Sequence, residues 1–232
     1  MGFKKHDWAP VYESRFQHTA GGRGTLVSDF YRPALSEAIQ YDRLAGYLDL
    51  KSLASALQGI DSILETKGEI RLIASVQLDE ENKPVLTNDE NPPLSTVEES
   101  RLSLIAHLMA EDRLEVRIAE PSNDSSGIFH PKLGILTDPE GDQISFEGSI
   151  NETFGAWYQN YERFKVHRSW KDAEARYVEA DINTFEQLWE DAHPDVKIYT
   201  LPEALEADLL DWQPKNEEEL EELVDLMQEI EV

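Results

Sequence analysis

The sequence predicts an α/β fold in which a mixed sheet is flanked by helices and followed by an acidic C-terminal helix. Segments with a helical apolar period follow segments with alternating apolar residues along most of the chain. A predicted hairpin adds antiparallel neighbours to the strands of these α/β units, which makes the sheet mixed. With 40% hydrophobic residues, the 232-residue chain has enough apolar surface for one large core.

The pattern of apolar residues in the N-terminal half predicts helices and strands in alternation. Residues 1–24 have no sustained period and end in a glycine-rich run, so they predict an N-terminal arm. Pro33 stands where a proline can begin a helix without breaking it. The predicted elements that follow the arm are a helix over 26–40, a strand over 41–49, a helix over 50–68 and a strand over 69–76.

The rest of the chain begins with a long polar, proline-containing loop over residues 77–95, which is either a functional segment or a plain surface insertion. Beyond it the same patterns predict a helix over 96–109, a strand over 114–120, hairpin strands over 127–136 and 143–149, a strand over 161–167, a helix over 170–192 and a strand over 195–201. We therefore predict a main domain over residues 25–200 and an acidic helical tail over 201–232.

The residue pattern of the tail predicts a well-capped amphipathic helix. Asn216 can cap it, and Glu219 stands three residues later as in a capping box. Its apolar stripe consists of Leu220, Leu223, Val224, Met227 and Ile230. Because such a stripe needs a partner, we expect the helix to pack on its own domain or on a second chain. An acidic arm that mimics nucleic acid is the alternative interpretation.

His130 and Lys132 are the first candidate functional residues. They are separated by one residue in an apolar run that predicts a strand, so both side chains are expected on the same face. This places an imidazole, which can act as a nucleophile or base, beside a fixed positive charge.

Further candidates follow at the end of the second hairpin strand. Gly148 permits close approach of the backbone, and Ser149 and Asn151 can donate hydrogen bonds to an anion. Glu162 begins the next predicted strand and could hold one tautomer of a histidine. Together with His130, these groups suit phosphoryl transfer without a metal. Trp157 and Tyr158 could stack on a nucleobase near them, although core packing is the better explanation for at least one of the two.

The spacing H-x-K followed by G-S-x-N resembles the phospholipase D superfamily, in particular its single-motif nucleases, which often carry a downstream acidic residue. The matching positions are His130, Lys132, Gly148, Ser149, Asn151 and Glu162. The sequence departs from the family pattern at one place. The aspartate expected five residues after the lysine is replaced by Thr137, and Asp138 stands one residue later.

The resemblance extends over residues 25–212, which are similar to a module at the N-terminus of prokaryotic helicases and phage-defence proteins. It implies a phospholipase D-like fold and, as a possible partner, a helicase domain or subunit in an antiviral defence system. No G-x4-G-K-[ST] motif of a helicase motor occurs in these residues.

The resemblance also implies a mechanism that needs two H-x-K motifs, whereas this chain has one. Two chains would then form a homodimer with one shared site. One His130 would attack phosphorus to form a phosphohistidine, and the other would protonate the leaving oxygen. Lys132, Ser149 and Asn151 would neutralise the phosphate oxygens, and Glu162 would orient the nucleophile. No cofactor is required.

The charge of the chain opposes a nucleic-acid substrate. The net charge is −26, and residues 203–232 contribute −11 of it, with 12 acidic residues and one lysine. Such a field repels nucleic acid unless salt screens it, as in a salty cytoplasm. Two function classes stay open: a phosphodiesterase that cuts DNA, or less favourably RNA, and a binding module that holds phosphate without turnover. A lipid phosphodiesterase ranks third, since no basic amphipathic helix is present.

Other classes are excluded by composition. The chain has no cysteine, and its six histidines lack the spacing of a zinc site, so no metal is expected. No apolar run approaches 18 residues, and the N-terminal lysines precede no hydrophobic segment. We therefore expect a cytoplasmic protein with no membrane partner.

Overall fold

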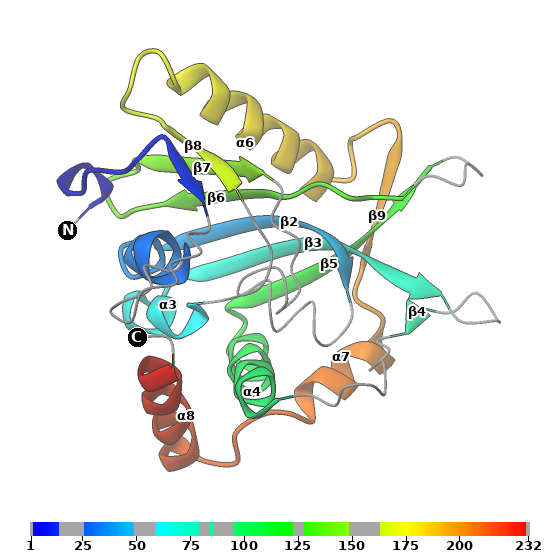
Figure 1. The fold of residues 1–232 in the computed structure, drawn as a ribbon. Coiled ribbons are helices and arrows are strands. Elements are labelled where there is room, and N and C mark those ends of the chain that lie inside the picture. Colours follow the sequence, from blue (N-terminus) through cyan, green and yellow to red (C-terminus); the bar gives the residue numbers. More distant parts are fainter. Residues whose placement is uncertain are drawn as a thin grey trace.

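The computed structural model describes residues 2–13, 26–48, 59–78, 84–85, 95–122, 128–148 and 163–230. Within these residues nine strands form one sheet, whose main path runs β1-β8-β7-β6-β2-β3-β5-β9, with β4 paired to β3 outside it. Helices cover both faces of this sheet (Figure 1). The predicted α/β class is confirmed.

The parallel part of the sheet consists of β2 (Gln40–Leu48), β3 (Glu69–Leu78) and β5 (Leu114–Pro121). Parallel neighbours need crossover connections. One connection contains α3 (Ile60–Thr66) and the other contains α4 (Thr96–Ala110), and both helices lie on the same face of the sheet (Figure 1).

The remaining strands are antiparallel to their neighbours. β6 (Leu133–Thr137) pairs with β2 and with β7 (Gln143–Gly148), and β8 (Arg163–Arg168) joins β7 to β1 (Val11–Glu13). On the opposite edge β9 (Val196–Thr200) pairs with β5. The prediction of a mixed sheet is therefore confirmed, because the hairpin of β6 and β7 lies beside the parallel strands.

Alternating residues of the strands form two cores, one on each face of the sheet. Along β3, Ile70, Leu72 and Ala74 pack on the side of α4, whereas Ile73 packs on the other side. That second face is covered by α6 (Ala175–Trp189), which crosses the sheet on the side opposite α3 and α4 (Figure 1). The site described below opens on the α6 side.

An ion-pair network holds α6 to the sheet. The Arg71 guanidinium donates to Asp42 Oδ1 at 2.7 Å and to Glu186 Oε1 at 2.6 Å, and it lies 4.8 Å from the centre of the Phe185 ring. Because these charges are partly buried and share several hydrogen bonds, they fix the helix more firmly than an exposed ion pair would.

The described part of the predicted N-terminal arm is packed into the fold. Phe3, in the short helix η1 (Phe3–Lys5), is fully buried, and the Trp8 indole donates to the Phe3 carbonyl at 2.7 Å. The strand β1 then joins the edge of the sheet. Residues 2–13 show no period because single aromatic side chains anchor them, so this stretch of the predicted arm packs on the sheet.

The predicted helix over 26–40 is shorter than expected. A π-helix, η2 (Val27–Tyr31), leads into α1 (Arg32–Leu35), and β2 already begins at residue 40. Pro33 lies in the first turn of α1, as predicted. In the predicted 77–95 loop, β4 (Pro84–Val85) pairs with β3, and Ser95 forms a capping box with Glu98 that begins α4.

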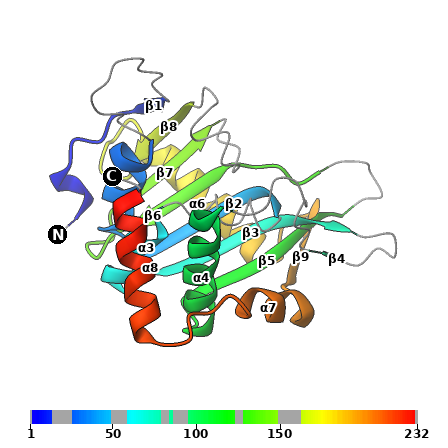
Figure 2. The same cartoon turned by 60° about the horizontal axis from the view of Figure 1, so that its bottom comes forward.

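The tail forms α7 (Glu203–Leu210) and α8 (Glu217–Ile230). Asn216 caps α8 as predicted, since its Oδ1 accepts from the Glu219 amide at 2.9 Å. Met227 is fully buried against the core, and Figure 2 shows α8 lying beside α4. Packing on its own domain is therefore confirmed. Among the described helices, none is long and apolar enough to cross a membrane.

Candidate active site

His130 and Lys132 precede β6 and are not part of it, because the strand begins at Leu133. The predicted strand was thus too long at its start. Pro131 explains the difference, since proline has no backbone N–H for the strand ladder and restricts the residue before it. Phe129 is 7% exposed, so its ring anchors the segment in the core on the α6 side while His130 is exposed.

The two side chains nevertheless meet, as their spacing predicted. Lys132 Nζ lies 2.7 Å from His130 Nε2. An ammonium group can only donate, so in this contact Nε2 offers its lone pair and the imidazole proton lies on Nδ1. Burial, and to a lesser degree the Lys132 charge, lowers the pKa of His130. Both effects favour the neutral imidazole, which is the nucleophilic form.

Gly148 is the last residue of β7, where it pairs with Phe164. A Cβ atom at this position would lie 2.2 Å from the Arg163 carbonyl oxygen. The predicted close approach therefore occurs, and in the described residues it is an approach between two strands of the chain itself. A role of Gly148 in binding substrate stays a prediction.

Four of the predicted site residues, Ser149, Asn151, Trp157 and Glu162, lie outside the described residues. The described chain stops at Gly148 and resumes at Arg163, at the end of the sheet where β6 begins. The register fixes this placement, because Glu147 is opposite Leu133 on β6 and Gly148 is opposite Phe164 on β8.

Two residues that the sequence analysis did not select lie against the histidine segment. A Cβ atom at Gly46 of β2 would stand 2.4 Å from His130 Nδ1, and the Ser75 hydroxyl of β3 donates to the Gly46 carbonyl at 2.5 Å. A single glycine within a strand pattern is the one sequence signal that could have indicated such a contact. No comparable signal marks Ser75.

A cavity of about 350 Å³ opens beside His130 on the α6 side of the sheet. Its walls include Leu44, Phe129, Leu188 and His193. The Asp195 amide donates to His193 Nδ1 at 3.2 Å, so Nδ1 acts as the acceptor in this contact. The cavity thus leads from the surface to the candidate nucleophile.

Asp138, the residue displaced by one position from the family pattern, lies at the opposite end of β6. It is fully buried, and its two carboxylate oxygens accept from the Phe3 amide at 2.7 Å and from the Asp142 amide at 2.8 Å. Its bonds tie the N-terminal segment to the turn between β6 and β7. Asp138 therefore has a structural role and no contact with His130.

Comparisons with solved structures give distant similarities. NucT from Helicobacter pylori is 15% identical with a TM-score of 0.42, over 69% of this chain and 87% of that one. Nuc from Salmonella typhimurium, described as a phospholipase D family member, is 14% identical with a TM-score of 0.44, over 82% and 98% of the two chains. Polyphosphate kinase from Porphyromonas gingivalis is 11% identical with a TM-score of 0.49, over 97% and 28%.

Sequence comparisons are more decisive. A search of curated proteins found no match. The family described as cardiolipin synthase, PLD-like domain, matches residues 54–189, which are more than half of the 232 residues and include His130 and Lys132. Each TM-score above lies below 0.5, so the assignment rests on this match. The chain belongs to the phospholipase D-like family.

Proposed function

We propose that this chain is a phosphodiesterase that cuts DNA without a metal, through a phosphohistidine intermediate. The observation that carries the proposal is the contact of 2.7 Å between Lys132 Nζ and His130 Nε2, in a place where burial and the Lys132 charge lower the pKa of the histidine and so favour its neutral form. A neutral imidazole next to a fixed ammonium matches the needs of attack on an anionic phosphodiester.

In the proposed reaction His130 Nε2 forms a bond to phosphorus while the bond from phosphorus to the leaving oxygen breaks. The leaving oxygen takes a proton from the His130 of a second chain, which acts in its imidazolium form and becomes neutral. Water then attacks phosphorus, its proton passes to that second histidine, and the P–N bond breaks to restore the first. Lys132 leaves Nε2 as the phosphate enters and then binds a nonbridging oxygen.

Ser149, Asn151 and Glu162 complete the proposed site. Ser149 and Asn151 would donate to the nonbridging oxygens, and Glu162 would accept from His130 Nδ1. The family mechanism uses two H-x-K motifs and this sequence contains one, so we propose a homodimer with the site between its chains. A helicase domain or subunit of an antiviral defence system is the proposed partner.

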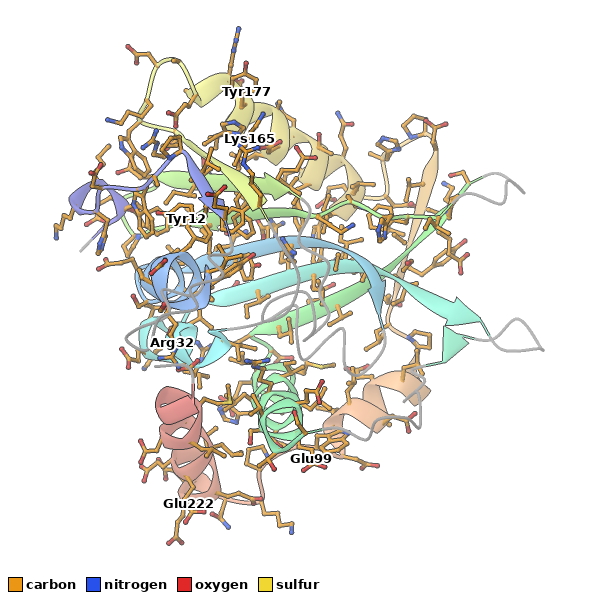
Figure 3. All side chains as sticks on the ribbon, viewed as in Figure 1. Tyr12, Arg32, Glu99, Lys165, Tyr177 and Glu222 are labelled. Atoms are coloured by element: carbon orange, nitrogen blue, oxygen red, sulfur yellow. The ribbon has the colours of Figure 1, made fainter. Side chains whose placement is uncertain are left out.

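Part of the net charge of −26 lies away from the candidate site. The acidic helices α7 and α8 pack with α4 on one side of the sheet. The cavity beside His130 opens on the other side, next to α6. Figure 3 shows Glu99 and Glu222 on the side of the molecule opposite Lys165 and Tyr177. The share of the repulsion that comes from residues 203–232, −11 of −26, therefore lies on a surface that the substrate does not need to approach.

A module that binds nucleic-acid phosphate without turnover is the second candidate function. The observations that favour it are the position of Asp138, one residue away from the family pattern, and the net charge of −26, which opposes the approach of a nucleic acid. Substrate cleavage distinguishes the two functions directly.

The test incubates the purified chain with single-stranded DNA, double-stranded DNA and RNA in excess EDTA. We expect DNA cleavage, an acid-labile phosphorylated form of the protein, and a dimer in sedimentation at several concentrations. His130→Ala should abolish cleavage and labelling. Cleavage that stops in EDTA, that persists in His130→Ala, or that is catalysed by a strict monomer would contradict the mechanism. Binding to DNA without cleavage would support the second function.

A further inference from the structure

The strand β2 contains a bulge next to His130. Leu44 is opposite Ile73 and Tyr47 is opposite Ser75, so three steps along β2 match two steps along β3. The additional residue lies in the pair Ala45–Gly46. Bulges bend a strand and redirect its groups, and they are frequent beside active sites.

The His130 ring lies directly on the glycine of this bulge. A Cβ atom at Gly46 would stand 2.4 Å from His130 Nδ1 and 2.9 Å from Cε1, and all three of the nearest atoms that it would meet belong to this ring. The backbone of Gly46 is outside the left-handed region, so alanine fits its dihedral angles. The imidazole is therefore the obstacle to a side chain at this position.

Ser75 joins the bulge to the histidine segment. Its hydroxyl donates to the Gly46 carbonyl at 2.5 Å and lies 3.4 Å from the Phe129 carbonyl, the residue before His130. The Phe129 ring is itself buried on the α6 side. One side chain on β3 thus contacts both the backbone under the imidazole and the backbone that carries it.

We propose that Ser75 and Gly46 are positioning residues that set the location of the His130 imidazole, Ser75 through its hydroxyl and Gly46 through its missing side chain. This inference rests on the proposed function of His130 as the nucleophile. Displacement of a reacting group by about 1 Å can lower a rate about a hundredfold, so small shifts of this ring matter.

A serine elsewhere in the sheet provides a matched control. Ser145 on β7 is fully buried, and its hydroxyl donates to Asp181 Oδ2 at 2.5 Å, which ties the strand to α6. Ser145→Ala and Ser75→Ala each remove one short hydrogen bond from the same sheet. If Ser75 only supports the fold, the two variants should behave alike.

The first measurement follows the imidazole itself and does not depend on turnover. In the full chain, the Cε1–H resonance of His130, assigned by its loss in His130→Ala, is titrated by NMR. We expect Ser75→Ala and Gly46→Ala to shift this resonance and to raise the pKa of His130, because the ring moves away from the Gly46 backbone and from the Lys132 charge. Ser145→Ala and Ser75→Thr should leave both unchanged. Unchanged resonances in Ser75→Ala and Gly46→Ala would overturn the inference.

The second measurement uses cleavage per folded molecule. Ser75→Ala should lower kcat by about tenfold to a hundredfold with KM within about twofold, since the nucleophile is displaced and the binding groups are kept. Ser75→Thr retains the hydroxyl, so its kcat should stay within about threefold of that of the unchanged chain. Ser75→Val has the shape of Ser75→Thr but no hydroxyl, so its kcat should stay as low as that of Ser75→Ala. Equal losses in Ser75→Ala and Ser145→Ala, or rescue by valine, would show a merely structural role.

The third measurement tests the glycine. In the otherwise unchanged chain, Gly46→Ala should lower the melting temperature, because the new methyl group meets the His130 ring. In the His130→Ala background that ring is gone, so Gly46→Ala should leave the melting temperature unchanged. An equal decrease in both backgrounds would contradict the contact. If the unchanged chain cleaves nothing, the proposed function fails, while the NMR and melting experiments still decide the positioning.

Discussion

The two ends of β6 carry polar residues of opposite kinds. At its C-terminal end Asp138 is fully buried, and both of its oxygens accept backbone hydrogen bonds. At its N-terminal end His130 is exposed, and its ring has a polar contact with Lys132. A buried carboxylate with satisfied oxygens stabilises a fold, whereas an accessible imidazole with a lowered pKa is prepared for chemistry. On the proposed function, β6 therefore has a structural group at one end and a reactive group at the other.

Removal of the imidazole should give the largest effect. We expect His130→Ala to lower the cleavage rate by about 10⁴-fold or more, as is usual for loss of a nucleophile. Its unfolding midpoint in urea should stay close to that of the unchanged chain, because the side chain is exposed. A large fall in the midpoint would show that this end of β6 is structural as well.

Removal of the ammonium should give the next largest effect. Lys132→Ala should lower kcat by about a hundredfold, or about 3 kcal/mol, because charge that develops on the phosphate loses its counter-charge. The matched control lies at the other end of β6, where the exposed Lys4 pairs with Asp142 at 2.7 Å. Lys4→Ala should change kcat less than twofold. Comparable losses in both variants would indicate a general charge effect.

Replacement of the buried carboxylate should affect stability and spare the chemistry. Asp138→Ala leaves the Phe3 and Asp142 amides without their acceptor, so we expect a loss of about 3 kcal/mol in the free energy of unfolding. Urea denaturation measures this loss. Cleavage per folded molecule should stay within about twofold at low temperature, and a severe loss there would join the two ends of β6 into one functional unit.

The pH dependence should give the smallest effect. Because burial and Lys132 lower the pKa of His130, the neutral nucleophile persists to lower pH than for an ordinary histidine. The acidic limb of the pH profile, where kcat rises with pH, should therefore lie at lower pH than the pKa of an ordinary histidine. In Lys132→Met the contribution of the ammonium is lost, so the pKa rises and the limb moves to higher pH. A limb that moves to lower pH would contradict this electrostatic relation.

Sequence patterns predicted those features that depend on near neighbours. The alternation in β3, the cap at Asn216 and the spacing of His130 and Lys132 all involve residues a few positions apart, and the structure confirms each. The start of β6 was misplaced because the apolar pattern continues through Pro131, which cannot join the ladder.

Features that depend on distant partners were not predictable in the same way. The N-terminal segment looked unanchored because its bond from Phe3 to Asp138 joins residues 135 positions apart. Likewise, nothing near Ser75 in sequence shows that its hydroxyl reaches the segment of His130. The roles of Ser149, Asn151, Trp157 and Glu162 stay predictions.

The sequence by itself therefore determined the α/β class, the family motif and the helix caps, because periodicity, spacing and capping are local relations between side chains and the adjacent backbone. Only the tertiary structure decided that Gly46 lies under His130 Nδ1, that Lys132 faces Nε2 and that α8 packs on its own domain. These contacts depend on the register of β2 against β3 and β6, bulge included, and on which apolar surfaces remain to be covered once the sheet has formed.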